Sequence, residues 1–158
     1  MAKKYYIAYG SNLVKSEMKH RCPSAKPVGT AVLKNYELEC RMYLTVTPKK
    51  NANTIVGVWE IDENDETKLD RYESYPELYS KKNIENLPVK AFDGSVMVVD
   101  AFVYTIREDA PLFPSTEEYY DRCFEGYKDF GIDTGNLVKA FRTALDSAIT
   151  LIGNAFGR

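Results

Sequence analysis

The stretch Lys4-Tyr-Tyr-Ile-Ala-Tyr-Gly-Ser-Asn-Leu13 decides the fold, because it joins a strand pattern directly to a turn and to the start of a helix. The β-branched and aromatic residues at its beginning favour a strand, and the Gly-Ser-Asn that follows is typical of a tight turn. Apolar and polar residues then recur at helical spacing, with Ser11 or Asn12 as the expected N-cap and Pro23 as the stop. The sequence therefore predicts a strand, a turn and a short helix in succession.

Four further segments have the composition of strands. The first of them has a polar break at Lys34-Asn35, so it is either one long strand with a kink or a hairpin. The last two flank Asp93-Gly94, a common hairpin turn, and should pair antiparallel. The segments are Gly29–Arg41, Thr54–Ile61, Tyr79–Val89 and Ser95–Ile106.

Helical patterns separate and follow these strands. Residues Asp62 to Tyr72 carry four acidic side chains in the first turn, where they complement the positive end of the helix dipole. Thr116–Phe130 and Gly135 to about Ile152 have helical periodicity interrupted by glycines. Antiparallel strands with helices outside them predict an α+β protein whose sheet curls into a small barrel.

Composition narrows the functional classes. The chain has 158 residues and a formal net charge of −2 with both signs mixed, which predicts one domain over 1–158 and argues against nucleic-acid binding. No apolar run approaches the length of a membrane span, and the N-terminus lacks a signal-peptide pattern, so we expect a cytoplasmic protein without membrane partners. Three scattered cysteines and the single His20 favour neither a disulfide framework nor a metal site.

Two local features contain residues that could bind a ligand or transfer a proton. Glycine in the Tyr9–Leu13 loop permits a positive φ and close backbone approach, and successive N–H groups at a helix start can hold a carboxylate or phosphate. Asp70 and Glu73 fall at a helix end, where the dipole disfavours negative charge and can raise the pKa of a carboxyl group. Taken alone, the loop is also explained as an ordinary turn, and the carboxylates as surface charges paired with Arg71 or Lys68.

The motifs taken together resemble the gamma-glutamylcyclotransferase family, which includes the AIG2-like proteins, over roughly Tyr5 to Gly131. They stand in the family's order along the chain and agree with its spacing, which makes the resemblance more specific than any one of them. They are Tyr9-Gly-Ser-Asn-Leu13, Cys22-Pro-Ser-Ala25, Gly29 to Tyr36, Gly57-Val-Trp-Glu-Ile61, Leu69-Asp-Arg-Tyr-Glu73, Val103-Tyr104, Pro114-Ser115, Tyr119 and Gly126-Tyr127.

The resemblance implies a small mixed, mainly antiparallel β-barrel with peripheral helices and Gly135 to Arg158 as a closing helix outside the match. It also implies cleavage of a gamma-glutamyl amide to 5-oxoproline and an amine or amino acid, with no metal or organic cofactor. The family's essential acidic residue falls on Glu73, although many members have glycine where this chain has Ser74. By the same resemblance the substrate-binding residues are Tyr9, Gly10, Ser11, Asn12, Leu13, Tyr79, Tyr104 and Tyr119.

This reaction agrees with the residues at hand, because the substrate's own α-amine is the nucleophile and the chain has no catalytic triad. A carboxylate with a raised pKa suits the proton transfer, and Glu73 would act as general base and then as general acid. Three interpretations remain: a cyclotransferase for a small gamma-glutamyl amide, one for a gamma-glutamyl amine or an acylated biosynthetic intermediate, and a non-catalytic binding or regulatory module that uses the same cavity.

Overall fold

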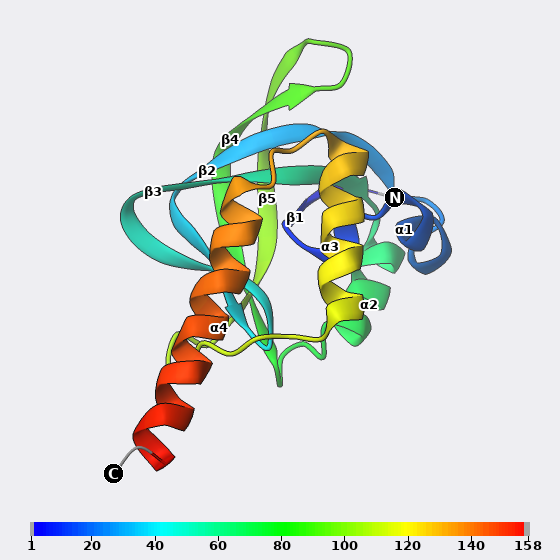
Figure 1. The fold of residues 1–158 in the computed structure, drawn as a ribbon. Helices are drawn as coiled ribbons and strands as arrows, with labels where there is room; N and C mark the ends of the chain where they lie inside the picture. The colour runs from blue at the N-terminus through cyan, green and yellow to red at the C-terminus, as the bar shows by residue number, and fades with distance from the viewer. Residues whose placement is uncertain (1, 157–158) are drawn as a thin grey trace.

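The structure, a computed structural model, describes residues 2–156 as one mixed sheet with helices around it (Figure 1). The strands are β1 Lys4–Ala8, β2 Lys26–Arg41, β3 Tyr43–Ile61, β4 Tyr79–Ala91 and β5 Val96–Ile106. The helices are the 3-10 turn η1 Ser11–Leu13, α1 Lys15–Arg21, α2 Glu63–Tyr72, α3 Glu117–Phe130 and α4 Gly135–Phe156. Of the closing helix expected over 135–158, positions 157–158 lie outside the described residues.

The five strands form a closed barrel in the order β1-β3-β2-β4-β5. Every pairing is antiparallel except that of β1 with β5, which is parallel from Tyr5 opposite Ala101 to Ile7 opposite Val103. This confirms the α+β class and the mainly antiparallel barrel. Closure pairs the outermost strands with each other, so the sheet has no free edge along the paired residues.

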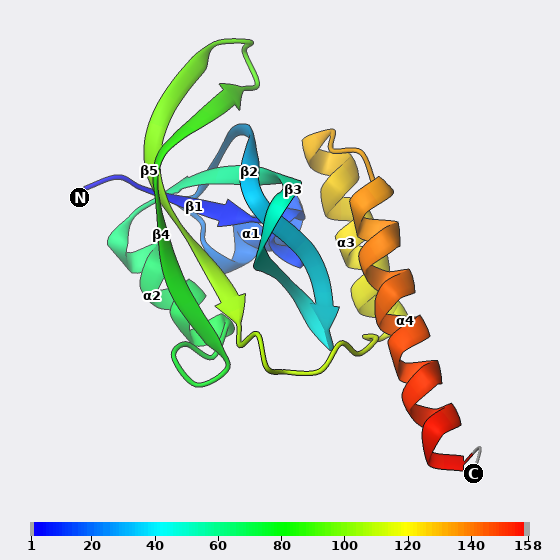
Figure 2. The same cartoon turned by 90° about the vertical axis from the view of Figure 1, so that its left-hand side faces the viewer.

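Two of the helices, α3 and α4, cover one side of the barrel. Helices α3 and α4 lie side by side along one side of it, and both views show the second half of α4 projecting beyond the sheet (Figures 1 and 2). The stacked rings of Tyr120 and Phe141, with centroids 3.9 Å apart, join these two helices. Within residues 2–156 no helix is long and apolar enough to cross a membrane.

Two local predictions were wrong. The first helix begins at Lys15 with Val14 at its N-cap, because Ser11 and Asn12 belong to the separate turn η1. Strand β3 begins at Tyr43 rather than near Thr54, so it forms a long hairpin with β2. The polar break at Lys34-Asn35 is a register shift within that hairpin, where Asn35 has a φ of 63°.

The turn η1 is held between the barrel and α3. Leu13 is fully buried, and a methyl group built on Gly126 of α3 would lie 2.7 Å from Leu13 Cβ and 3.0 Å from its carbonyl carbon. A second glycine, Gly57 on β3, faces the same side chain, with a built methyl 2.3 Å from Leu13 Cδ2. These two glycines leave the space that lets α3 and the barrel approach the turn.

We predict that Gly126→Ala destabilises the protein by about 1–3 kcal/mol, because the added methyl group meets backbone atoms of Leu13 and Val14 that cannot rotate away. Gly153→Ala is the matched control, since nothing lies within 4 Å of a methyl built there. In a helix that change should leave stability equal or raise it by up to about 1 kcal/mol. Urea denaturation followed by circular dichroism measures both; equal midpoints for the two variants would contradict close packing at Gly126.

Candidate active site

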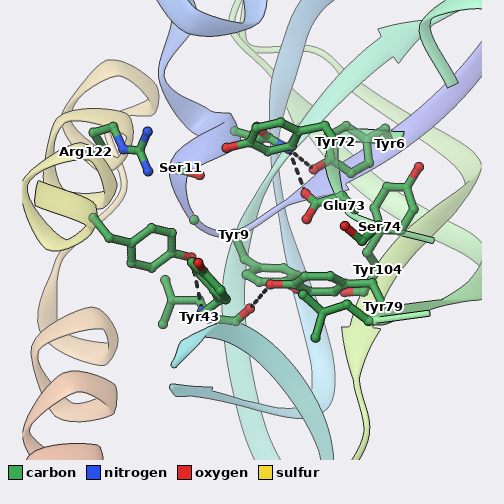
Figure 3. A pocket seen from close by; sticks show the side chains of 15 residues that line it. Tyr6, Tyr9, Ser11, Tyr43, Tyr72, Glu73, Ser74, Tyr79, Tyr104 and Arg122 are labelled. Carbon is green, nitrogen blue, oxygen red and sulfur yellow. Dashed lines mark hydrogen bonds between the residues drawn. The ribbon is translucent and has the colours of Figure 1, made fainter. Parts of the chain in front are cut away.

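A cavity of about 270 Å³ opens where η1, the end of α2, the start of β3 and α3 meet (Figure 3). Glu73 is the one acidic residue among those that line it within residues 2–156. All the site residues predicted from the sequence except Leu13 line this cavity. The complete lining is Tyr6, Tyr9, Gly10, Ser11, Asn12, Tyr43, Leu44, Tyr72, Glu73, Ser74, Leu78, Tyr79, Tyr104, Tyr119 and Arg122.

Glu73 reaches the cavity because it is the C-cap of α2. Its N–H donates to Leu69 O at 2.8 Å, which fixes the backbone at the end of the helix. The next residue, Ser74, turns the chain with a φ of 51°, a left-handed conformation that glycine adopts more readily. The serine that departs from the family pattern therefore keeps the backbone shape that a glycine would favour.

The environment of Glu73 favours its neutral form. Burial raises the pKa of this carboxyl group from its ordinary value of 4.5 to about 7, although the Arg21 guanidinium and a hydrogen bond from Asn12 act in the opposite direction. The raised pKa was expected from the negative end of the helix dipole, but its main cause is desolvation. At neutral pH the group is thus present in both protonation states.

Asn12 holds Glu73 in place. Its Nδ2 donates to Glu73 Oε1 at 3.0 Å and to Tyr6 Oη at 2.9 Å, while its Oδ1 accepts from Arg21 Nη1 at 2.6 Å. The guanidinium of Arg21 lies 3.5 Å from the centroid of the Tyr72 ring. Both the nitrogen and the oxygen of the Asn12 side-chain amide are therefore hydrogen-bonded, and the amide orients the carboxylate of Glu73 toward the cavity.

All four backbone carbonyl groups from Tyr9 to Asn12 accept a hydrogen bond. Tyr127 Oη donates to Tyr9 O at 2.9 Å, and Trp59 Nε1 donates to Asn12 O at 3.0 Å. The carbonyls of the two residues between them accept from the N–H groups of Leu13 and Val14, each at 3.0 Å. The N–H groups of Ser11 and Asn12 come before this hydrogen-bonded turn and take no part in it, so they can donate to an anionic ligand.

Gly10 provides space for its neighbours in the cavity wall. The expectation of a positive φ in this loop is wrong, since Gly10 has a φ of −139°. A methyl group built there would lie 3.2 Å from Tyr119 Oη and 3.3 Å from Leu44 Cδ1. Close approach, the other expected reason for a glycine, is what the structure shows.

The tyrosines of the cavity differ in their hydrogen bonds. Tyr79 donates to Leu44 O at 3.1 Å, Tyr9 to Tyr104 O at 2.7 Å and Tyr104 to Asp70 Oδ1 at 2.5 Å. Tyr6 and Tyr119 instead accept, from Asn12 Nδ2 and from the Leu44 N–H. The first group uses its protons within the protein, whereas Tyr6 and Tyr119 accept a bond and still carry a proton of their own.

Two sequence interpretations need correction. Leu13 does not line the cavity: its side chain is buried in the core and its N–H is bonded to Gly10 O. Asp70 lies outside the cavity lining and pairs with Lys81 Nζ at 2.8 Å rather than with Arg71 or Lys68. Of the two neighbouring carboxylates, Glu73 alone faces the cavity.

Sequence reasoning missed several residues of the lining, and for three of them a signal was present. Tyr6 is on β1, the strand that leads directly into the Tyr9–Leu13 loop, and this closeness in sequence was the signal. Its hydroxyl accepts from Asn12 in that loop. Arg122 follows Tyr119 by three residues on α3, a spacing that puts two side chains on the same helix face. Tyr43, Leu44 and Leu78 join the cavity only through the tertiary arrangement, whereas Tyr72 directly precedes Glu73 in the chain.

The described residues thus form a closed α+β barrel with a cavity in which one acidic side chain lies near a glycine-containing loop. A family model described as gamma-glutamyl cyclotransferase, AIG2-like, matches residues 6–122 of the chain. The chain therefore belongs to the gamma-glutamyl cyclotransferase, AIG2-like family. No curated protein matched its sequence.

Solved structures agree with the fold. A structure described as gamma-glutamyl cyclotransferase is 21% identical with a TM-score of 0.67, and the match covers 88% of this chain and 86% of that one. The human uncharacterized protein loc79017 is 22% identical with a TM-score of 0.65, over 89% and 87% of the two chains. YkqA from Bacillus subtilis is 19% identical with a TM-score of 0.69, over 91% of this chain and 55% of YkqA. At these identities the likeness shows the fold.

We predict that Glu73→Gln stabilises the protein at pH 8 and not at pH 4. With a folded pKa of about 7 against an ordinary 4.5, the folded state binds the proton more tightly, so ionisation of Glu73 lowers stability as pH rises from 4.5 to 7. Glutamine removes that cost, which amounts to about 1–3 kcal/mol above pH 7 and vanishes below 4.5. Urea titrations at both pH values measure it, with the exposed Glu77→Gln as control; a gain that does not change with pH would refute the raised pKa.

Proposed function

We propose that the protein is a gamma-glutamyl cyclotransferase that cleaves a gamma-glutamyl amide into 5-oxoproline and a free amine or amino acid. The observation that carries this proposal is Glu73, a carboxyl group with a pKa raised to about 7 that faces a cavity and is oriented by Asn12. Membership of the family supports the reaction type.

In the proposed reaction the substrate supplies its own nucleophile. Glu73 accepts a proton from the substrate α-ammonium, and the resulting amine attacks the γ-carbonyl carbon to close a five-membered ring. Protonated Glu73 then gives its proton to the departing nitrogen as the carbon–nitrogen bond of the amide breaks. A second proton follows the same route from the ring nitrogen to the released amine, so Glu73 ends as it began and the atoms balance.

The raised pKa fits both halves of this cycle. An ordinary glutamate, with a pKa of 4.5, is a weak base toward an α-ammonium, whereas a group with a pKa of about 7 accepts and returns the proton at a smaller free-energy cost. The N–H groups of Ser11 and Asn12 bind either the α-carboxylate of the glutamyl group or the oxyanion formed at the γ-carbonyl.

The cysteines support an intramolecular nucleophile rather than a thiolate. All three are free and buried. Burial raises the pKa of Cys22 and of Cys40 to about 11 and that of Cys123 to about 12, so each is a thiol at neutral pH. A thiol of this kind is a poor nucleophile, and none of the three lines the cavity.

The test is incubation with a panel of gamma-glutamyl amino acids and gamma-glutamyl amines, with release of 5-oxoproline as the readout. Glu73→Gln should lower kcat on the preferred substrate by about 10²-fold or more, because the amide keeps the shape of the side chain but cannot accept a proton. Its affinity for 5-oxoproline, measured by calorimetry, should change little. Glu77→Gln, an exposed change four positions along, serves as the control.

The pH profile gives an independent check on the same assignment. The value of kcat/KM should rise with pH and level off above about 7, because only ionised Glu73 accepts the proton. A profile that is flat between pH 5.5 and 8, or a Glu73→Gln variant with near wild-type turnover, would remove Glu73 from the mechanism. Binding of 5-oxoproline without release from any panel member would favour the non-catalytic module.

A further inference from the structure

Arg122 brings a positive charge to the cavity from the wall opposite Glu73. It projects from α3 toward Ser11, while Glu73 lies on the other side of the space (Figure 3). Within residues 2–156 it is the one lysine or arginine among the lining residues. The cavity therefore presents an acidic group at one side and a guanidinium at the other, which is the arrangement that a ligand with a cationic and an anionic end requires.

The guanidinium of Arg122 has capacity left for an anion. Its partner in the protein is Glu17, whose Oε1 lies 3.5 Å from Nη1, at the upper limit for a hydrogen bond. Arg122 Nε and Glu17 Oε2 are both buried and have no hydrogen-bond partner among the described residues. Arg21, in contrast, donates to Asn12 at 2.6 Å and stacks on Tyr72. Because Nε is buried, the N–H donors of Arg122 left for a carboxylate are those of its Nη groups.

Exposure separates the two ends of the cavity. At the floor of the cavity Asn12, which donates to Glu73, is only 4% exposed, whereas the side chain of Arg122 is 42% exposed. In the proposed reaction the glutamyl group must occupy the floor, because its amine has to reach Glu73. The departing group extends from the γ-carbonyl toward solvent, and hence toward the rim where Arg122 lies.

We propose that Arg122 binds a carboxylate on the departing group, so that the enzyme prefers gamma-glutamyl amino acids to gamma-glutamyl amines. This inference rests on the proposed function and adds the substrate class. In a gamma-glutamyl amino acid the carboxylate is attached to the carbon next to the departing nitrogen, whereas a simple amine offers the guanidinium nothing to bind. Arg122 would thus be a specificity-determining residue, with no part in the proton transfer.

The experiment compares two substrates that differ by one carboxylate, gamma-glutamyl-alanine and gamma-glutamyl-ethylamine. The wild-type protein should have the higher kcat/KM on gamma-glutamyl-alanine. Arg122→Met, which keeps an unbranched apolar side chain and removes the charge, should lower that value by about 10- to 100-fold, as expected for the loss of a charge-assisted hydrogen bond. Turnover of gamma-glutamyl-ethylamine should stay within about twofold, and Arg142→Met, an exposed change on α4, should leave both substrates unaffected.

A binding measurement makes the inference independent of turnover. In the Glu73→Gln background, calorimetry should show tighter binding of gamma-glutamyl-alanine than of gamma-glutamyl-ethylamine, and Arg122→Met should abolish the difference. An equal loss on both ligands would overturn the proposal and assign Arg122 to the glutamyl α-carboxylate or to the fold; an unchanged preference would overturn it outright. Carboxylate-dependent binding without any 5-oxoproline release would leave Arg122 assigned and reject the proposed reaction instead.

Discussion

One amide side chain, that of Asn12, links the elements that surround the cavity. It donates to Glu73 at the end of α2 and to Tyr6 on β1, and it accepts from Arg21 on α1. The backbone carbonyl of Asn12 accepts from Trp59 Nε1 on β3, and Trp59 is 2% exposed. Since Asn12 is itself 4% exposed, each lost partner would leave a buried polar group unpaired, at a cost of about 1–3 kcal/mol. The position of the carboxylate therefore depends on the packing of several separate elements.

The same packing sets the chemistry of Glu73. Withholding water from a carboxyl group destabilises its charged form and moves its pKa toward neutral pH. Arg21 and Asn12 limit that destabilisation without removing it, since the pKa of Glu73 still reaches about 7. Burial of Glu73 thus has two results: it raises the proton affinity of the carboxyl group, and it lowers the stability of the folded protein when that group is ionised.

Most of the barrel could be predicted from sequence, and the exceptions have physical reasons. Strand β1, α2 and the β4–β5 hairpin carry strong local signals, such as the acidic first turn of α2 and Asp93-Gly94 between the strands. In the missed part of β3, Pro48–Asn53 at the hairpin end are mostly exposed and lack alternating apolar residues. Leu44 and Val46 before them do alternate with threonines, and this short strand signal was overlooked. Glu73 and the loop were found through their motifs. Arg122 was missed although its spacing from Tyr119 puts both side chains on one helix face, because its place opposite Glu73 depends on how α3 packs on the barrel.

The parallel pairing of β1 with β5 determines when this site can form. The barrel closes where Tyr5 meets Ala101, so the chain between them must be complete before β1 gains its second neighbour. Contacts between segments so distant in sequence are slow to form, because loop-closure entropy opposes them. The loop that bears Asn12 starts where β1 ends, and α3 follows β5 along the chain. During synthesis the cavity is therefore completed late, and a ligand bound in it reports a fully closed barrel rather than a partly folded chain.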